Sequence, residues 1–182
     1  MIYLIGGPPR VGKSILAQEF INNKPIYSFS TDFLYDIDQV RDIENFDKLG
    51  IIQKGEAFFP ILERLIGNIE RQSENCLIDG DVILPGHVKK LSEKYQIRAC
   101  FLGLSETSLE DIIRYGGHFN WPEYKIKNGM GDNVSDLAQR TILSSKIIES
   151  ECEIHNQKYY DMATNFKASK QMALNFLTQS SE

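Results

Sequence analysis

A glycine-rich turn near the amino terminus limits the fold of this chain more than any other feature. Residues 7–14 read GPPRVGKS, which matches the pattern G-x-x-x-x-G-K-[ST]. The apolar stretch 2–6 before the turn predicts a strand, and a helical pattern starts at Lys13 and ends before Pro25. Because strand, turn and helix follow one another in this order, the turn is expected to hold phosphate groups.

The turn has the chemistry that phosphate binding requires. Glycines let the backbone curl so that N–H groups point at an anion, and the helix adds free N–H groups and the positive end of its dipole. Lys13 adds a positive charge, and the Ser14 hydroxyl is a ligand for Mg²⁺. Since Pro8 and Pro9 lack an N–H, the amides of residues 11–14 should carry most of the binding. The full predicted set is Gly7, Pro8, Pro9, Arg10, Val11, Gly12, Lys13, Ser14 and Ile15.

Apolar runs alternate with helical patterns along the chain, which favours an α/β fold with a mainly parallel sheet. The length of 182 residues fits a single domain spanning residues 1–182. A final helix should follow the last strand, with Phe166, Ala173, Phe176 and Leu177 on one side. The strands predicted after the first are residues 26–30, 76–79, 97–102 and 158–161.

Two segments interrupt this alternation. Residues 33–75 are too long for a simple crossover and contain an amphipathic helix with apolar side chains between Phe58 and Ile69. A shorter helix is predicted at residues 106–114. Residues 115–133 are rich in Gly, Asn and aromatic side chains, and loops of this length are usually functional or disordered.

Three aspartates follow predicted strands and could serve the chemistry. Asp79 ends a buried strand, near the loop in a parallel sheet, and is the candidate that holds Mg²⁺ through water. Asp81 would face a substrate or, like Asp79, simply sit in a polar turn. Asp32 follows the second strand and is either a general base and substrate anchor or the N-cap of residues 33–35.

Arginines near the loop could stabilise charge on a transferred phosphoryl group. Arg10 lies inside the loop, and Arg114 and Arg140 flank the segment 115–133. Surface positions are the ordinary alternative for all three. His87 and His155 are expected to be polar surface side chains that join no metal cluster.

Composition excludes several classes of function. A net charge of −5 without a dense Lys/Arg run argues against nucleic-acid binding by bulk electrostatics. The first ten residues lack the features of a signal peptide, and no apolar run is long enough to cross a membrane. Three cysteines without metal-binding spacing read as structural thiols. We therefore expect a cytoplasmic protein without membrane or nucleic-acid partners.

These features together resemble the small P-loop kinases, the adenylate-kinase-like nucleoside and small-metabolite kinases. The resemblance is carried by GGPPRVGKS, by Asp32, by Asp79-Gly80-Asp81 and by the helix before the glycine-rich segment. It implies a three-layer α/β/α fold with a five-stranded parallel sheet in the order 2-3-1-4-5. It also implies ATP and Mg²⁺ as cofactors, a substrate-binding insertion at residues 33–75 and a lid at 115–133.

On the residues themselves, Lys13, Asp32 and Arg114 are the candidate catalytic residues for moving the γ-phosphate of ATP to a small acceptor. Arg114 and Arg140 would also contact ATP, and Asp32 and Asp81 the acceptor. The Asp-Gly-Phe-Pro-Arg stretch of nucleoside-monophosphate kinases is replaced by DGDV at residues 79–82. A hydroxyl-bearing acceptor without a phosphate is therefore at least as compatible as a nucleotide.

A regulatory ATP-binding module without catalysis is the alternative. A GTPase switch is disfavoured, because Asn23-Lys24 is not followed by the x-Asp that completes a guanine-binding motif. The sequence is compatible with a monomer or a homodimer.

Overall fold

A five-stranded parallel sheet forms the centre of the molecule. The structure is a computed structural model, and it describes residues 1–35, 37, 40, 43–72, 74–115 and 134–179. The strands lie in the order β2-β3-β1-β4-β5, and every adjacent pair is parallel. The predicted order is thus confirmed. The strands are β1 (Ile2–Gly6), β2 (Tyr27–Ser30), β3 (Cys76–Gly80), β4 (Ile97–Gly103) and β5 (Lys158–Asp161).

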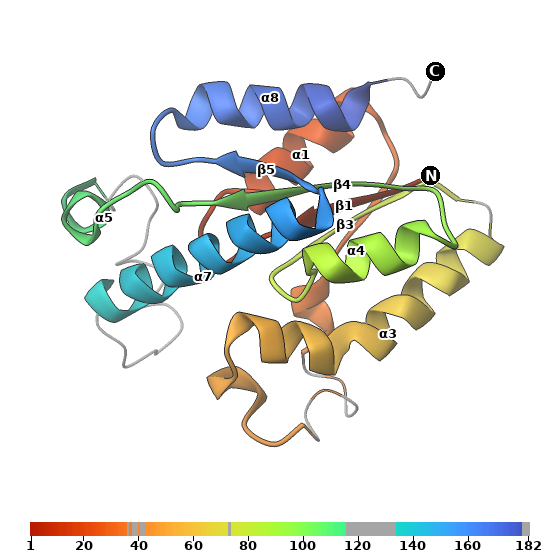
Figure 1. Cartoon of the computed structure of the whole chain (residues 1–182). Coiled ribbons are helices and arrows are strands. Elements are labelled where there is room, and N and C mark those ends of the chain that lie inside the picture. Colours follow the sequence, from red (N-terminus) through yellow and green to blue (C-terminus); the bar gives the residue numbers. More distant parts are fainter. Residues whose placement is uncertain (36, 38–39, 41–42, 73, 116–133, 180–182) are drawn as a thin grey trace.

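Helices cover both faces of the sheet and complete the three layers (Figure 1). One face carries α1 (Lys13–Asn23) and α8 (Phe166–Thr178). The other carries α3 (Ile51–Arg71), α4 (Pro85–Ser92) and α7 (Val134–His155). A short helix, α5 (Leu109–Tyr115), follows β4, and two 3₁₀ turns, η1 (Thr31–Leu34) and η2 (Phe46–Lys48), precede α3.

The central strand β1 supplies side chains to two separate cores. Ile2 and Leu4 pack with buried residues of α3 and α4, whereas Tyr3 and Ile5 pack with buried residues of α1 and α8. Successive side chains of a strand point to opposite faces, and all four are 3% exposed or less. A run that is apolar at every position is therefore the expected sequence of a central strand covered by helices on both sides.

The apolar face of α3 packs into the core of the protein. Phe58, Leu62 and Ile66 are fully buried and join the core between α3, α4 and the sheet. Ile61, Leu65 and Ile69 are partly buried against the same core. The segment 33–75 thus packs on the sheet through α3, and its assignment as a substrate-binding insertion stays a prediction.

The helix predicted at residues 106–114 begins three residues later, at Leu109. The carboxylate of Asp161 accepts hydrogen bonds from the backbone N–H groups of Ser105 (2.6 Å) and Glu106 (3.1 Å) and so holds this stretch in a turn. The Ser108 hydroxyl then accepts from the Asp111 N–H at 3.0 Å, as an N-cap does. A long-range contact with the end of β5 therefore decides where α5 starts.

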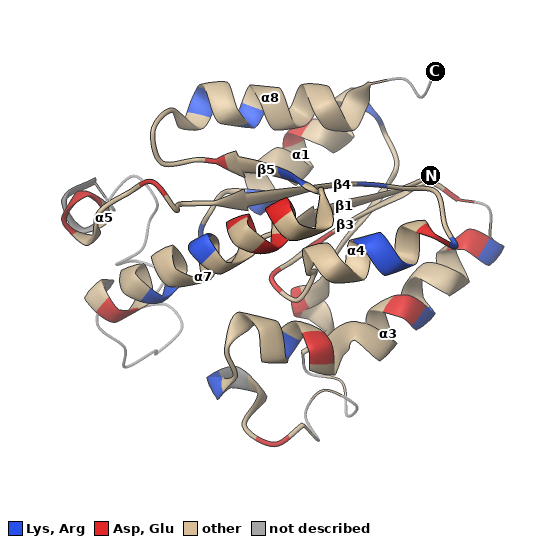
Figure 2. Ribbon diagram, in the orientation of Figure 1, with Lys and Arg blue, Asp and Glu red and all other residues tan. Residues whose placement is uncertain are grey.

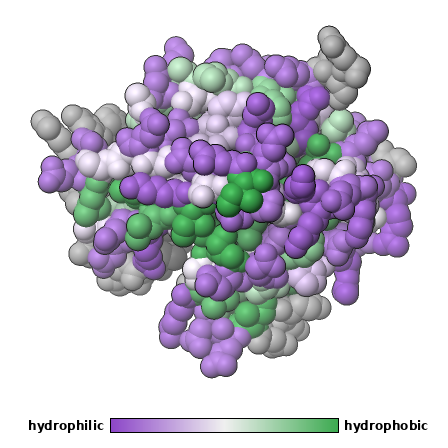
Figure 3. All heavy atoms as spheres, in the orientation of Figure 1, coloured by the Kyte–Doolittle hydropathy of each residue, from purple (hydrophilic) through white to green (hydrophobic). Residues whose placement is uncertain are grey.

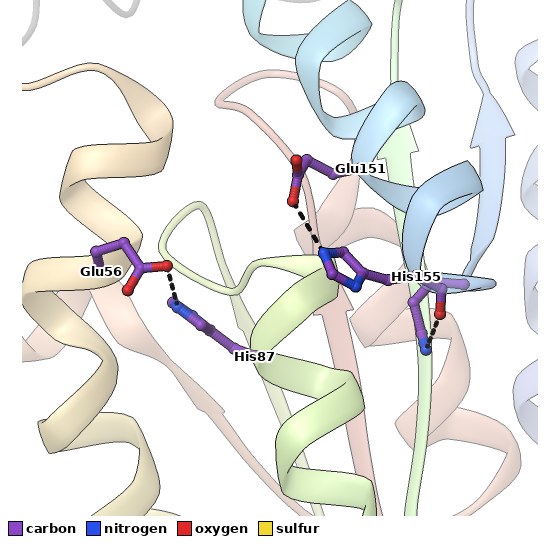
Figure 4. Close-up of polar contacts among 5 residues, drawn as sticks. Glu56, His87, Glu151 and His155 are labelled. Carbon is purple, nitrogen blue, oxygen red and sulfur yellow. Dashed lines mark hydrogen bonds and ion pairs between the residues drawn. The ribbon is translucent and has the colours of Figure 1, made fainter.

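The expectation that His87 lies on the surface is wrong, because its side chain is 1% exposed. Its ring stacks on Phe59 at 4.2 Å between centroids, and Nε2 lies 3.1 Å from Glu56 Oε1. Figure 4 shows His87 of α4 pointing at Glu56 of α3, while His155 pairs with Glu151 within α7. Burial lowers the pKa of His87, so the contact between α3 and α4 is made by a neutral ring.

Three further expectations concern the lid, the cysteines and membrane spans. Of the predicted lid, residues 116–133 lie outside the described residues. All three cysteines are buried free thiols, in keeping with a structural role. Among the described helices, none is long and apolar enough to cross a membrane.

Candidate functional site

The glycine-rich turn joins the carboxyl end of β1 to the start of α1. Its backbone takes positive φ angles at three places: 130° at Gly7, 69° at Arg10 and 97° at Gly12. A Cβ on Gly12 would lie 2.7 Å from Cε2 of Phe166, the first residue of α8. Glycine is needed there both for the left-handed backbone and for the close approach of α8. Arg10 adopts a conformation that non-glycine residues rarely take, as residues at ligand sites often do.

The amino terminus of α1 is left open. Its N-cap, Gly12, offers no side chain, and the first turn contains no acidic residue. The earliest intrahelical bond runs from the Leu16 N–H to the Gly12 carbonyl at 3.0 Å. The N–H groups of Lys13, Ser14 and Ile15 therefore have no acceptor within the helix. Together with the helix dipole, these amides form a site for an anion.

Lys13 lies folded over the loop that precedes it. Its Nζ donates to the carbonyls of Gly7 and Pro8, both at 2.9 Å. Burial lowers the pKa of Lys13, and the nearby carboxylates of Asp81, Asp32 and Asp79 act in the opposite direction. The ammonium group is thus positioned above the turn and within electrostatic reach of three acids.

Pairing of β2 with β3 brings the three acids together. Ser30 of β2 is in register with Asp79 of β3, and each strand ends within one residue of this pair. Thr31 packs over the turn after β3 so closely that a Cβ on Gly80 would lie 1.9 Å from Thr31 Oγ1. The glycine between Asp79 and Asp81 therefore lets η1 approach β3. Asp32 consequently lies beside Asp79 and Asp81, although the chain separates them by more than forty residues.

Burial, and secondarily the neighbouring carboxylates, raise the pKa of two carboxyl groups of the site. Asp79 is 6% exposed, and burial raises its pKa against the opposing effects of Lys13 and a hydrogen bond from Ser30. Asp32 is exposed as a residue, but partial loss of hydration and the neighbouring Asp81 raise the pKa of its carboxyl. Raised carboxyl pKa values next to a lysine at the carboxyl edge of a parallel sheet are typical of functional sites.

The structure separates the two predicted roles of Asp32. The 3₁₀ turn η1 is capped by Ser30, whose hydroxyl oxygen accepts from the Asp32 N–H at 3.4 Å. The carboxylate of Asp32 is thus not the N-cap of residues 33–35. Electrostatic contact instead links it to Asp81, Lys13 and Lys54.

Two residues of the site were missed by sequence reasoning. Tyr35 donates its hydroxyl to Asp81, and burial together with that carboxylate raises its pKa. Its ring rests against Phe46 and Phe58. Lys54, in the first turn of α3, has a charge that opposes the rise in the pKa of Asp32, and its Nζ lies 5.6 Å from the centre of the Phe46 ring. Neither residue belongs to a sequence motif. The one signal that could have pointed to them is a hydroxyl or amine group close to the strand ends that carry the aspartates.

The predicted arginines are placed unequally. Arg10 lies in the loop, half-buried, and its charge lowers the pKa of Lys13. Arg114 belongs to α5, but its side chain is outside the described part of the structure. Arg140 is exposed near the start of α7. Contacts of Arg114 and Arg140 with a nucleotide stay predictions.

The polar groups of the site fit a nucleoside triphosphate with Mg²⁺. The open amides at the start of α1 and Lys13 suit phosphate oxygens, and the exposed Ser14 hydroxyl and the Asp79 carboxylate are oxygen ligands of the kind Mg²⁺ prefers. Among the described residues, no group of three or more His, Cys, Asp or Glu side chains is arranged to hold a metal alone. Magnesium at phosphate sites usually keeps several waters and takes one or two carboxylates plus phosphate oxygens.

Comparison by sequence finds no relative: no family model and no curated protein matches the chain. Solved structures do match. A gluconokinase from Sinorhizobium meliloti 1021 superposes with a TM-score of 0.58 at 16% identity, over 97% of this chain and 90% of that one. A shikimate kinase from Acinetobacter baumannii, in complex with shikimate, gives a TM-score of 0.51 at 15% identity, over 97% of this chain and 90% of that one.

A second shikimate kinase, from Bacteroides thetaiotaomicron, gives a TM-score of 0.53 at 12% identity and covers 98% of both chains. The chain has the fold of the P-loop small-metabolite kinases. The predicted adenylate-kinase-like architecture is thereby confirmed, since strand order and near-complete coverage agree. At these identities the P-loop kinase likeness concerns the fold, and the chemistry rests on the residues described above.

Proposed function

We propose that this protein is an ATP- and Mg²⁺-dependent phosphotransferase that moves the γ-phosphate of ATP to a hydroxyl group of a small acceptor. The observation that carries the proposal is the convergence of Asp32, Asp79 and Asp81 on Lys13. A protein that only binds ATP needs the loop and one metal-binding acid. Additional carboxylates on the acceptor side of the loop favour transfer over binding alone.

Each group has a role that follows from its position. Bound ATP and Mg²⁺ supply the phosphoryl group and neutralise charge on its oxygens. The amides of Lys13, Ser14 and Ile15 bind phosphate oxygens, and Lys13 exchanges the carbonyls of Gly7 and Pro8 for a phosphate. Ser14 and Asp79 serve the metal. Arg114 and Arg140 are proposed to add positive charge around the transferred group.

Asp32 is proposed as the general base. It lies at the end of β2 beside the loop, and its carboxylate is free of the capping role that Ser30 fills. A raised pKa makes a carboxylate a stronger proton acceptor, because proton transfer improves as the pKa of the base approaches the working pH. Asp32 would accept the proton of the acceptor hydroxyl as that oxygen bonds to phosphorus and the bond to ADP breaks.

The charges around Asp32 favour an acceptor without a phosphate group. Asp81 is proposed to bind acceptor hydroxyls, and the hydrogen bond from Tyr35 would hold its carboxylate in position. Three carboxylates here repel the double negative charge of an acceptor phosphate. Of the described cations, Lys13 and then Lys54 have the largest opposing effect on the pKa of Asp32. Residues 33–75 would contribute the acceptor site through η1 and the start of α3. Small hydroxylated metabolites fit these conditions better than nucleotides.

The experiment is a screen for ADP release over nucleosides, nucleotides, sugars and small acids, with gluconate and shikimate included because the similar structures are kinases of these compounds. A hit must form a phosphorylated acceptor, detected by phosphorus NMR, and must disappear in Lys13→Ala. Tight binding of ATP with no ADP release for any acceptor would favour the regulatory ATP-binding module instead.

A further inference from the structure

The outer face of α7 exposes large apolar side chains in a regular pattern. Leu143 is 54% exposed, Ile147 43% and Ile154 69%. Other apolar residues of the same helix, among them Ile148 and Cys152, are buried in the core. The helix therefore has one apolar side for the protein interior and a second one that faces solvent. Figure 3 shows hydrophobic surface that follows α7 across the face in view.

The exposed residues have the spacing of a helix-pairing stripe. Leu143, Ile147, Ser150 and Ile154 are separated by four, three and four residues, which is the a/d pattern of helices that pack side by side. All four are exposed. At about 1.5 Å per residue the stripe is roughly 17 Å long. Scattered surface apolar residues are common, but a repeat along one helix indicates a contact surface.

Charges beside the stripe define what can pair with it. Lys146 and Glu153 are both exposed and lie one heptad apart on the same flank. Figure 2 shows that positive residues precede a group of negative residues along α7. If a second α7 packed antiparallel, Lys146 of each copy would face Glu153 of the other. In a parallel arrangement this flank would instead face the opposite flank of the other helix, where Glu151 already pairs with His155 of its own chain.

We propose that α7 forms a two-fold symmetric, antiparallel contact with α7 of a second copy of this chain. In this pairing Leu143 lies opposite Ile154 of the second copy, and Ile147 lies opposite Ser150, whose small side chain leaves room for it. A self-complementary surface is what a two-fold contact requires. One helix face buries less than a standard interface, so we expect a reversible dimer whose population depends on concentration.

The test measures mass and is independent of the phosphotransferase activity. Sedimentation velocity over a concentration series should show a shift from the 20.8 kDa monomer towards twice that mass. Ile147→Asp should abolish the shift and leave the circular dichroism spectrum unchanged, because the side chain faces solvent. Met172→Asp, at another exposed apolar position on α8, is the matched control and should still dimerise.

A charge-reversal cycle tests the antiparallel arrangement. Lys146→Glu and Glu153→Lys should each weaken the dimer about tenfold or more, and the double variant should restore it. A monomer at every concentration would overturn the proposal, as would a dimer that persists in both Ile147→Asp and Leu143→Asp. A dimer lost in these two variants but unaffected by both charge reversals would overturn the antiparallel geometry.

Discussion

Two neighbouring helices, α1 and α8, begin in opposite ways. The first turn of α8 is closed, because the Asn165 side chain accepts from the Ala168 N–H at 3.0 Å. The first turn of α1 has no such cap, and its N-cap is a glycine. Since an unfilled helix start is less stable than a capped one, the difference indicates that α1 leaves its amides for a ligand. The closed start of α8 meanwhile supports the loop, through the contact of Phe166 with Gly12.

The short turn η1, on the other side of the site, has a capped start like that of α8. Ser30 caps η1, so the carboxylate of Asp32 stays available although Asp32 lies only two residues after the cap. Because Ser30 fills the start of η1, the Asp32 carboxylate is not needed as a cap. Where the structure leaves a helix start open, as at α1, backbone N–H groups stay available to an anion. Four substitutions test this contrast.

Lys13→Ala should have the largest effect. If α1 is the open end that binds phosphate, turnover should fall by about 10³-fold or more, because a charge that stabilises the transferred group is lost. Lys167→Ala removes a lysine from the first turn of α8 and is the matched control. Steady-state kinetics with the acceptor found in the screen measures both. Equal activity of the two variants would refute a special role for the start of α1.

Asp32→Asn should lower turnover by about 10²-fold or more, with little change in ATP affinity measured by calorimetry. Asp136→Asn, in the first turn of α7, is the control. Because the pKa of Asp32 is raised, the ionised base is lost as pH falls through a value above the ordinary aspartate range near 4. The acid limb of the pH–rate profile should therefore lie above the ordinary aspartate range and should be absent in Asp32→Asn. An unchanged limb would assign it to another group.

Gly12→Ala should weaken both folding and phosphate binding. The new methyl group meets a positive φ and the Phe166 ring, and strain of this kind costs about 1–3 kcal/mol. Gly50→Ala changes the glycine N-cap of α3, where φ is −66° and the closest contact is the movable Gln53 side chain. Urea denaturation should show a clearly larger loss for Gly12→Ala. Similar losses of unfolding free energy in the two variants would mean that the loop does not require glycine at position 12.

Asn165→Ala should have the smallest effect. Loss of an N-cap typically lowers the free energy of unfolding by about 1 kcal/mol, whereas Gln171→Ala, exposed on the same helix, should change it by about 0.5 kcal/mol or less. ATP affinity should change little, since α8 supports the loop through Phe166. A loss of ATP affinity as large as that of Gly12→Ala would show that the closed helix start also belongs to the binding site.

Local sequence patterns predicted the elements whose bounds depend only on residues close to them in sequence. The strand before the loop, the extent of α1 and the strand at residues 158–161 were predicted to within a residue, because their periodicity and their Pro and Gly boundaries are properties of short segments. The start of α5 was not, since Asp161 sets it from the far end of the sheet. Burial of His87 likewise depends on Glu56 and Phe59 of another helix.

The sequence by itself determined that a strand, a glycine turn and a helix follow one another near the amino terminus, in the pattern expected of a phosphate-binding loop. Spacing of Gly, Lys and Ser within eight residues is enough for that, because the geometry is local. Only the tertiary structure decided what surrounds it. Strand pairing brings Asp32 to Asp79 and Asp81, and the packing of η1 and α3 adds Tyr35 and Lys54. These groups are distant in sequence, so only the sheet order and the packing of the helices bring their charges together.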